Sequence, residues 1–379
     1  MKAILFANTE WYLYNFRLSL ARALRDAGFD VLLISPPGEY GEVLREEGFR
    51  WEPVPMNRRS LNPLRELGVL RHLVRVYRRE RPDVVHHFTV KCVIYGAIAA
   101  AMARIPARVN AVAGMGYVFT NPAVTARILR PIVRGLMRAA MNNSRSRLVL
   151  QNNDDVAGFV DAKLADRDKI RLIRGSGVNT ERFAFRDAKR GHDGVFRVLL
   201  AARLLSDKGI FEYVDAARQL KGEGLRIDFL LAGAPDSGNP ASIVQSQLDA
   251  WAQEGVVELL GQVRDMAELL SRVDVAVLPS YREGLPKSLI EAAASGLPLV
   301  TTDVPGCREV VAHEVDGLIV PVRDAGALAD AIRRLYENPE WARELGRAAR
   351  KKALAEFDER IVIEKTLDVY RELVEGGEL

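Results

Sequence analysis

Two carboxylates flank the expected start of a helix, and their spacing suits a ligand with hydroxyl groups on both sides of a phosphate. Glu283 belongs to a charged loop, and Glu291 to the second turn of the helix that follows. The amides of Lys287 and Ser288 lie between them, at a helix N-terminus, where unpaired N–H groups and the helix dipole favour an anion. Pro286 and Glu291 lie about 7.5 Å apart along such a helix. A nucleotide sugar has this layout, with a sugar, two phosphates and a ribose in line. Two solvated acids beside a helix are the alternative.

Two cations precede this stretch. Arg203 and Lys208 follow an apolar run at residues 196–201 that is typical of a buried strand, and Gly209 closes their loop. Arginine binds phosphate through a planar fork, and lysine binds it as a point charge. The two side chains could therefore converge on the phosphates that the helix at 287–294 would bind.

An aromatic segment follows the first expected strand, residues 2–7. Six of its residues are candidates for binding the acceptor of such a sugar: Asn8, Trp11, Tyr12, Tyr14, Asn15 and Arg17. Sheets of α/β proteins bind ligands at the C-terminal ends of their strands, so the three rings could form a platform for an acceptor. Packing of the rings under the first helix, at residues 19–27, is an equally open interpretation.

Two further pairs of candidate acceptor-binding residues stand at strand ends. His86 and His87 close the strand that begins at Asp83, and Gly114 and Gly116 follow the strand at 109–112. A histidine there is placed for chemistry, and a glycine lets the backbone approach a ligand closely. The alternative for the histidines is that they are core residues with satisfied hydrogen bonds. The alternative for the glycines is that they form a plain turn.

Apolar runs and helical periodicities alternate along the whole chain, which predicts doubly wound parallel sheets with helices on both faces. A polar connection between Gly175 and Gly194 is the expected linker between two domains. The first strand is followed by neither a GxGxxG fingerprint nor a Walker A sequence. Further strands are expected at residues 31–35, 83–87, 109–112, 148–151, 170–173, 196–201, 225–231, 256–261, 274–279, 297–301 and 317–320.

Composition narrows the class of protein. A chain of 379 residues is too long for one core and suits two domains. Its two cysteines, Cys92 and Cys307, lie far apart, which favours a reducing compartment over a disulfide framework, and its five histidines show no metal-ligand spacing. The opening MKAILFAN is too short an apolar run for a signal peptide, and no run reaches the roughly 18 apolar residues that span a membrane.

Charge is distributed unevenly. Residues 1–180 hold 28 Lys+Arg against 16 Asp+Glu, whereas residues 181–379 hold 26 against 34. No acid occurs from Val84 to Asn153, where nine residues are basic. Basic amphipathic segments at residues 64–79 and 126–147 predict contact with an anionic membrane. Solvated surface helices of a soluble enzyme look similar, and nucleic acid is the other anionic partner that a basic half permits.

The second half of the chain resembles the retaining glycosyltransferases of family 4, which have the GT-B fold. The matching motifs occur in the family's order over roughly 190 residues: Arg203 and Lys208 in ARLLSDKG, Gly233 in LLAG, Gly261 in ELLGQV, Glu283 to Glu291 in EGLPKSLIEAAASGLPLV, Gly306 and Glu309 in VPGCREVV, and Gly317 in DGLIVP. In the first half, FANTEWYLYNFRLSLARAL, HHFTVKCVIYG and GMGYVF resemble the branch that adds sugars to polyprenyl-diphosphate-linked acceptors.

This resemblance implies a role for each matching residue. Arg203 and Lys208 would stabilise the departing diphosphate, and Glu283 would contact the donor sugar. Glu291 would bind the ribose, and the loop at Gln262 and Val263 the base. Further donor-binding residues would be Gly233, Gly284, Leu285, Pro286, Lys287 and Ser288. The family implies retention by front-face displacement without a metal or other cofactor.

The resemblance also implies an α/β GT-B architecture, with two Rossmann-like domains that face each other across a cleft. Residues 1–180 would bind the acceptor, residues 195–355 the nucleotide sugar, and the helix at 359–374 would pack back on the first domain. A UDP sugar is the expected donor, and a polyprenyl-diphosphate-linked sugar at the inner face of the cytoplasmic membrane is the expected acceptor. Many members have a histidine where this chain has Ala113, and His86 or His87 could replace it.

Three alternatives stay open at this stage. A soluble glycosyltransferase for small acceptors shares every donor motif and would be fully active without membranes. An epimerase of the same fold would convert the donor with no acceptor present. A nucleic-acid-binding protein would show binding that depends steeply on salt, although the acids at 283 and 291 argue against nucleic acid.

Overall fold

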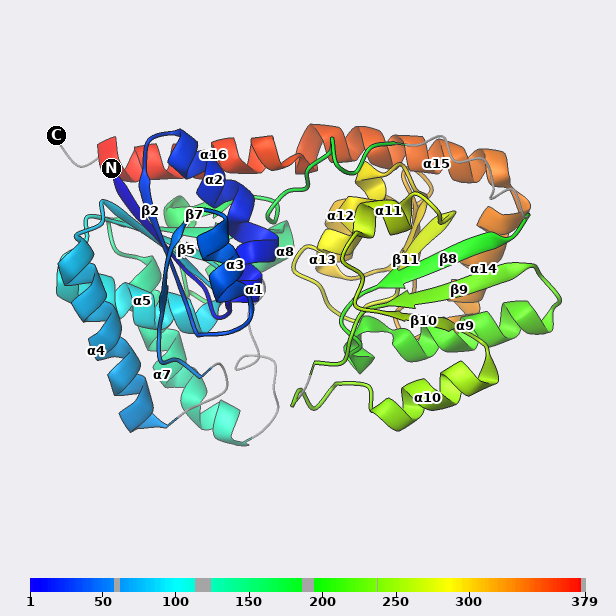
Figure 1. Ribbon diagram of the computed structural model, residues 1–379, viewed down its shortest axis with the longest axis horizontal. Coiled ribbons are helices and arrows are strands. Elements are labelled where there is room, and N and C mark those ends of the chain that lie inside the picture. The colour runs from blue at the N-terminus through cyan, green and yellow to red at the C-terminus, as the bar shows by residue number, and fades with distance from the viewer. Residues whose placement is uncertain (58–61, 113–123, 186–193, 237, 376–379) are drawn as a thin grey trace. The chain divides into compact units, whose positions relative to one another are not determined.

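The computed structural model of the protein describes residues 1–57, 62–112, 124–185, 194–236 and 238–375 (Figure 1). The chain forms two compact units. The N-terminal unit comprises Met1–Ser176 together with Arg360–Leu379, and the C-terminal unit comprises Gly177–Glu359. The expected linker began at Gly175, next to this boundary, and its residues 186–193 lie outside the described part of the chain.

The N-terminal unit is built on a seven-stranded sheet in the order β3-β2-β1-β4-β5-β6-β7, with every pair parallel. The strands are short apolar runs, as expected for strands buried on both faces. They are β1 (Lys2–Phe6), β2 (Asp30–Ser35), β3 (Arg50–Pro53), β4 (Val84–Phe88), β5 (Ala107–Ala111), β6 (Ser146–Leu150) and β7 (Ile170–Leu172).

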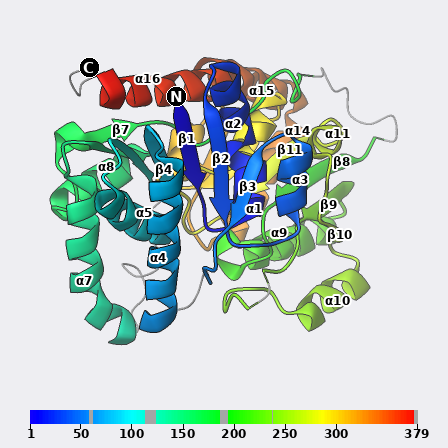
Figure 2. The same ribbon diagram turned by 60° about the vertical axis from the view of Figure 1, so that its left-hand side comes forward.

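Helices cover both faces of this sheet. Ile4, Phe6 and Val85 point toward α4 and α5, whereas Ala3, Leu5 and Val84 point toward α2 and α16, as the alternation of a strand requires. Figure 2 shows α4, α5 and α7 side by side. The helices are α1 (Glu10–Tyr12), a π-helix (Leu13–Arg17), α2 (Leu18–Asp26), α3 (Tyr40–Glu46), α4 (Pro63–Glu80), α5 (Val90–Ala103), α7 (Val124–Met141), α8 (Asn153–Asp161) and α16 (Glu359–Glu375), with a 3-10 turn at Arg167–Lys169.

The final helix, α16, returns to the N-terminal unit. Val362, Val369 and Leu373 join the core that includes β1 and α2. Glu372 accepts hydrogen bonds from Arg147 (2.8 Å) and Arg171 (2.9 Å). The core of the first unit is therefore completed by the end of the chain.

The C-terminal unit has a six-stranded parallel sheet in the order β10-β9-β8-β11-β12-β13. Its strands are β8 (Phe196–Ala201), β9 (Ile227–Ala232), β10 (Glu258–Gly261), β11 (Val275–Leu278), β12 (Leu299–Thr302) and β13 (Leu318–Val320). Its helices are α9 (Ile210–Gly222), α10 (Gln245–Glu254), α11 (Met266–Leu270), α12 (Lys287–Ala294), α13 (Pro305–Val310), α14 (Ala325–Glu337) and α15 (Pro339–Lys352), with a 3-10 turn at Ser206–Lys208 and a π-helix at Ala353–Phe357.

Both units are doubly wound α/β domains, which confirms the predicted fold class. In each sheet the strand order reverses in the middle, between β1 and β4 and between β8 and β11. Ligands of open α/β sheets bind outside the carboxyl ends of the strands at such a switch point. The topology therefore singles out the loops after these four strands.

The first helical segment begins earlier than expected. A helix was expected at residues 19–27, but the chain is already helical from Glu10 onward. Thr9 caps the helix, since its hydroxyl accepts a hydrogen bond from the amide of Tyr12 (3.1 Å). Tyr12 packs on Phe16 and Phe88, with ring centroids 5.1 and 5.9 Å apart. Burial of these aromatic rings stabilises a helical path that the sequence pattern did not suggest.

The packing of α15 on the loop after α12 can be tested at Gly346. A methyl group there would overlap the carbonyl oxygen of Gly296. We expect Gly346→Ala to lower the free energy of unfolding of the C-terminal unit by about 1–3 kcal/mol, because overpacking forces the backbone apart. Gly222→Ala, at an open position at the end of α9, is the matched control and should be neutral or slightly stabilising. Calorimetry of both variants measures the difference, and equal melting temperatures would contradict the close approach.

Candidate functional site

An ion pair joins the two loops at the switch point of the C-terminal unit. Lys208 follows β8 and Glu283 follows β11, and the two strands are neighbours. Lys208 Nζ donates to Glu283 Oε1 over 2.6 Å, and the side chains are only 14% and 13% exposed. The structure thus brings together two of the three residues that the sequence predicted to be catalytic.

Glycine lets these loops approach each other. Gly209 has a φ of 70°, and a side chain there would overlap the carbonyl oxygen of Pro279. The amide of Tyr281 and the hydroxyl of Ser280 both donate to the carbonyl of Asp207, at 2.8 and 3.1 Å. The backbone around Lys208 is therefore held against the end of β11.

The Glu283 loop is also held from the other side, by the loop after β12. A side chain at Gly306, in the first turn of α13, would come within 2.7 Å of the carbonyl oxygen of Glu283. Thr302, at the end of β12, donates its hydroxyl to the carbonyl of Ser280. Three successive strand ends therefore fix the position of Glu283.

The helix that follows Glu283 begins where the sequence suggested. Helix α12 begins at Lys287, and Pro286 is its N-cap residue. Proline has no side-chain oxygen, and no side chain caps this helix. Ser288 lies in the first turn, where amides have no partner within the helix. An anion at this N-terminus would be favoured by those amides and by the helix dipole.

Glu291 lies in the second turn of α12 with a side chain that is 15% exposed. Burial raises the pKa of its carboxyl, while Lys287, 3.7 Å away, and Arg182 lower it in part. Sequence reasoning missed Arg182, which precedes the core residue Phe183 near the start of the C-terminal unit. Its charge complements Glu291 from a position more than a hundred residues earlier in the chain.

Arg203 pairs with a different acid. Its Nη1 atom donates to Asp236 Oδ2 over 2.8 Å, and its side chain is 53% exposed. Asp236 lies in the loop after β9, and the sequence analysis did not single it out. Arg203 and Lys208 therefore each form an ion pair with a different acid. In the described part of the chain the two cations are not held together by a shared partner.

The remaining predicted donor residues line the neighbouring strand ends. Gly233 follows β9, and a side chain there would overlap the carbonyl oxygen of Ala202. Its amide donates to Gly261 over 2.7 Å, which ties the end of β9 to that of β10. Gln262 is exposed immediately after β10, whereas Val263 packs partly inward. Gly284 and Leu285 connect Glu283 to the N-terminus of α12.

The predicted acceptor residues of the N-terminal unit are mostly packed. Tyr14 contacts Tyr40, with centroids 5.1 Å apart, and Asn15 donates to the carbonyl of Trp11 over 3.0 Å. Trp11 is 37% exposed and contacts Phe16. Asn8 is half-buried directly after β1. Gly114 and Gly116, like Ala113, lie outside the described residues.

The two histidines of β4 have different environments. His87 is a core residue, since Nδ1 bonds Asn110 (2.8 Å), Nε2 bonds Tyr77 (3.1 Å), and burial lowers its pKa to about 4. A side chain at Gly96 would overlap its ring. His86 bonds Tyr370 of α16 through Nδ1 (2.8 Å), and its buried Nε2 has no hydrogen-bond partner. Of the pair, His86 alone keeps a nitrogen for a further partner.

Within the described ranges, no group of three or more His, Cys, Asp or Glu side chains is arranged to hold a metal ion. Cys92 and Cys307 are both buried free thiols.

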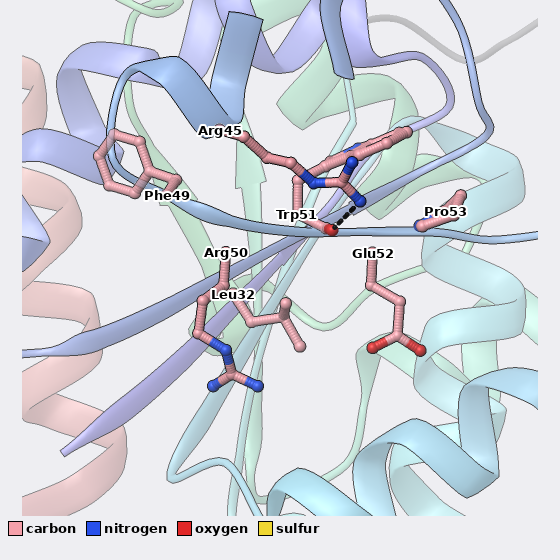
Figure 3. A pocket seen from close by; sticks show the side chains of 7 residues that line it. All are labelled: Leu32, Arg45, Phe49, Arg50, Trp51, Glu52 and Pro53. Carbon is pink, nitrogen blue, oxygen red and sulfur yellow. Dashed lines mark hydrogen bonds between the residues drawn. The ribbon is translucent and has the colours of Figure 1, made fainter. Parts of the chain in front are cut away.

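A cavity of about 410 Å³ lies elsewhere, along the edge strand β3 (Figure 3). The guanidinium of Arg45 lies 4.9 Å from the centroid of the Trp51 ring. Arg50 forms an ion pair with Glu80 at 3.0 Å. These cations already have partners, and no predicted site residue lines the cavity. Its lining residues are Leu32, Arg45, Phe49, Arg50, Trp51, Glu52 and Pro53.

Family models match most of the chain. Residues 2–153 match a model described as "Glycosyl transferase 4-like", and residues 182–352 match one described as "Glycosyl transferases group 1".

Two curated relatives act on lipid-linked sugars, as their names state. The N,N'-diacetylbacillosaminyl-diphospho-undecaprenol alpha-1,3-N-acetylgalactosaminyltransferase of Campylobacter jejuni is 29% identical over 374 residues, covering 96% of each chain. The UDP-Gal:alpha-D-GlcNAc-diphosphoundecaprenol alpha-1,3-galactosyltransferase of Escherichia coli is 26% identical over 85% of this chain and 83% of its own.

Solved structures share the fold at low sequence identity. The Anabaena protein HepE in complex with UDP superposes with a TM-score of 0.79 at 19% identity, over 97% of this chain and 99% of that chain. Sucrose-phosphate synthase from Thermosynechococcus elongatus superposes with a TM-score of 0.81 at 21% identity, over 100% of both chains.

The buried carboxyl of Glu291 should lower the stability of the folded chain at neutral pH, although the same carboxylate is a candidate ligand-binding group. Because burial raises the pKa of Glu291 in the folded state, the folded chain binds a proton more tightly than the unfolded chain. Stability then falls as pH rises from the unfolded pKa, near 4.5, through the raised folded pKa. We expect Glu291→Gln to raise the melting temperature at pH 7, and the gain to disappear toward pH 4.

A second glutamate supplies a control of opposite sign. Arg218 lowers the pKa of Glu254 in the folded state, so Glu254→Gln should lower the melting temperature slightly at pH 7, with a difference that also vanishes in acid. Thermal unfolding between pH 4 and pH 8 measures both variants. A Glu291→Gln protein that is less stable than the wild type at pH 7 would show that its neighbours, and not burial, dominate at Glu291.

Proposed function

The chain belongs to glycosyltransferase family 4 and has the GT-B fold, and we propose that it transfers a hexose or N-acetylhexosamine from a UDP sugar to a polyprenyl-diphosphate-linked sugar acceptor. The observation that carries the donor part is the Lys208–Glu283 pair at the end of β8 and β11, directly before the uncapped N-terminus of α12. The acceptor part is supported by the relatives that act on diphospho-undecaprenol-linked sugars.

Each group at this switch point has a task in the proposed reaction. Lys208 and the amides at the start of α12 would bind the donor diphosphate, whose negative charge grows as it departs. Glu283 positions Lys208 through their ion pair and would contact the donor sugar. Glu291, seven positions beyond the loop residue Gly284, would accept hydrogen bonds from ribose hydroxyls, for which a carboxylate is suited.

Bond making and breaking would occur on one face of the sugar. The bond between the anomeric carbon and the phosphate oxygen breaks, and the acceptor oxygen bonds to that carbon from the same face. The acceptor proton passes to the departing phosphate oxygen. Configuration is retained, and the protein itself supplies the positive charge through Lys208, Arg203 and the helix dipole, so we propose that no metal ion takes part.

The donor site is tested by removing its buried cation. We expect Lys208→Ala to lower kcat/KM on the order of 10²- to 10³-fold, because the growing charge of the diphosphate loses a preorganised partner. Lys221→Ala is the matched control, since Lys221 lies at the end of α9 and bonds only the carbonyl of Gly255 among its described contacts. Transfer from a panel of UDP sugars to short polyprenyl-diphosphate-linked sugars measures the rates. A Lys208→Ala enzyme with wild-type kcat/KM would overturn the donor site.

We also propose that the N-terminal unit rests on an anionic membrane surface. None of the helices in the described ranges is both long and apolar enough to cross a membrane. Helix α4 instead presents leucine and arginine together, because Leu64 and Leu67 are 81% and 43% exposed. Arg65, Arg71 and Arg75 are exposed on the same helix.

Vesicle binding tests this surface. Each basic residue near an anionic bilayer contributes about 1 kcal/mol, so replacing Arg65, Arg71 and Arg75 by alanine should weaken binding roughly a hundredfold. Leu64→Ser with Leu67→Ser should weaken it further by removing apolar contact with the interface. The control replaces three exposed arginines of the C-terminal unit, Arg218, Arg272 and Arg343. Flotation with vesicles that contain phosphatidylglycerol gives the affinity, and equal loss in the control would refute a site on α4.

A further inference from the structure

The switch point of the N-terminal unit holds polar groups that the fold leaves unsatisfied. The chain leaves β1 toward α1 and the π-helix, and it leaves the neighbouring strand β4 toward α5. The segments after these two strands diverge at the C-terminal edge of the sheet, where α/β proteins bind ligands. Three buried polar atoms without a hydrogen-bond partner belong to these segments or to β4 itself: Arg17 Nε, His86 Nε2 and Thr89 Oγ1.

Arg17 is a buried cation without an acid. It is 6% exposed and ends the π-helix, a distortion that often marks a functional site. Its Nη2 donates to the hydroxyl of Tyr12 (2.9 Å), and its guanidinium lies 4.4 Å from the centroid of the Phe88 ring. No carboxylate in the described part of the chain forms an ion pair with it. A desolvated charge needs a counterion, and two aromatic faces replace only part of the lost hydration.

The residue after Phe88 adds a second group. Thr89 is the N-cap residue of α5, yet its φ of 75° and ψ of 151° lie in a region suited to glycine, and its side chain makes no capping bond. Its buried Oγ1 lies beside the Cys92 thiol and has no hydrogen-bond partner of normal geometry. The 14-residue helix α5 therefore begins at the sheet edge with no side chain satisfying its first turn.

The surrounding charges favour an anion. His86 contacts Phe88, with ring centroids 4.0 Å apart. Burial, the nearby Arg17 and His87 all hold the pKa of His86 well below its usual value, so its ring is neutral at physiological pH. The acid of the segment after β1, Glu10, lies against Gly38 in the loop after β2, the strand on the other side of β1. The neutral ring of His86 therefore adds no positive charge beside Arg17, and Glu10 lies against a different loop.

We propose that Arg17, the Thr89 hydroxyl and the first-turn amides of α5 form a second anion site, and that this site binds the diphosphate of the lipid-linked acceptor. The identity of the ligand rests on the proposed function, whereas the anion site rests on the geometry of this unit alone. An arginine fork, a hydroxyl and a helix N-terminus are the groups that bind phosphate elsewhere. One ligand would supply the counterion of Arg17, the partner of Thr89 and the cap of α5.

Titration calorimetry on the full chain tests the site with two probes, inorganic pyrophosphate and farnesyl diphosphate. Saturating UDP keeps the probes from the proposed donor site. We expect both probes to bind, and Arg17→Gln to weaken both by about 10- to 100-fold, as expected for loss of a charged hydrogen-bond donor. Arg17→Lys keeps the positive charge but loses the planar guanidinium, so its affinity for both probes should lie between those of the wild type and Arg17→Gln.

A second variant separates binding from folding, because a buried arginine can also matter for stability. Thr89→Gly removes the hydroxyl and relieves the strained backbone, so its melting temperature should equal or exceed that of the wild type while diphosphate binding falls several-fold. Arg25→Gln is the matched control. Arg25 is an exposed arginine of α2 that bonds the carbonyl of Glu47, and its loss should leave diphosphate binding unchanged.

The possible outcomes distinguish a failure of the second anion site from a failure of the proposed donor function. Wild-type affinity in both Arg17→Gln and Thr89→Gly, or complete displacement of pyrophosphate by UDP, would overturn the second site. Binding of pyrophosphate without farnesyl diphosphate would overturn its assignment to the acceptor. Lys208→Ala should lose UDP and keep pyrophosphate. A wild-type protein that fails to bind UDP but binds pyrophosphate through Arg17 would refute the donor function and leave the anion site standing.

Discussion

The contact between the loops after β8 and β11 is the constraint on which the candidate donor site depends. Gly209 permits it, because no side chain fits against the carbonyl of Pro279. Hydrogen bonds from the Ser280 hydroxyl and the Tyr281 amide to the carbonyl of Asp207 stabilise the contact. Only then can Lys208 and Glu283 meet at 2.6 Å in a largely buried position. A buried pair of this kind adds little stability, since desolvation offsets much of the attraction. Its value lies in holding a cation beside the loop that leads into α12.

The two units use the same topology for different electrostatics. In the C-terminal unit each cation at the switch point has an acid, Glu283 for Lys208 and Asp236 for Arg203. In the N-terminal unit Arg17 is surrounded by aromatic rings and a neutral histidine. The first arrangement suits a ligand that brings both hydroxyls and phosphate, because acids and cations are both presented. The second suits a ligand whose recognised part is purely anionic.

The sequence predicted every described strand except β3, the doubly wound fold, and the placement of the proposed donor residues at or after strand ends, because short apolar runs and glycine-bearing loops are local signals. It could not predict which acid pairs with which cation. Lys208 and Glu283 are 75 positions apart, and Arg203 and Asp236 are 33 apart, so the pairing depends on strand order. The adjacent histidines show the same limit. His87 bonds Asn110, whereas His86 bonds Tyr370, 284 positions away. Two adjacent residues of the same type therefore have different environments, because their partners come from distant parts of the chain that a local sequence pattern does not reveal.

Helix α16 gives the chain an unusual order of assembly. Val362, Val369, Tyr370 and Leu373 fill the core between β1, α2 and β4, which are among the first segments to be synthesised. During translation the C-terminal unit, Gly177–Glu359, is complete in sequence before the N-terminal unit has its last helix. Until then the hydrophobic cluster that includes Leu5, Leu20 and Phe88 lacks the four side chains that α16 contributes to it. The unit made first is therefore finished last, and a nascent chain exposes this face of its first sheet until synthesis reaches its final helix.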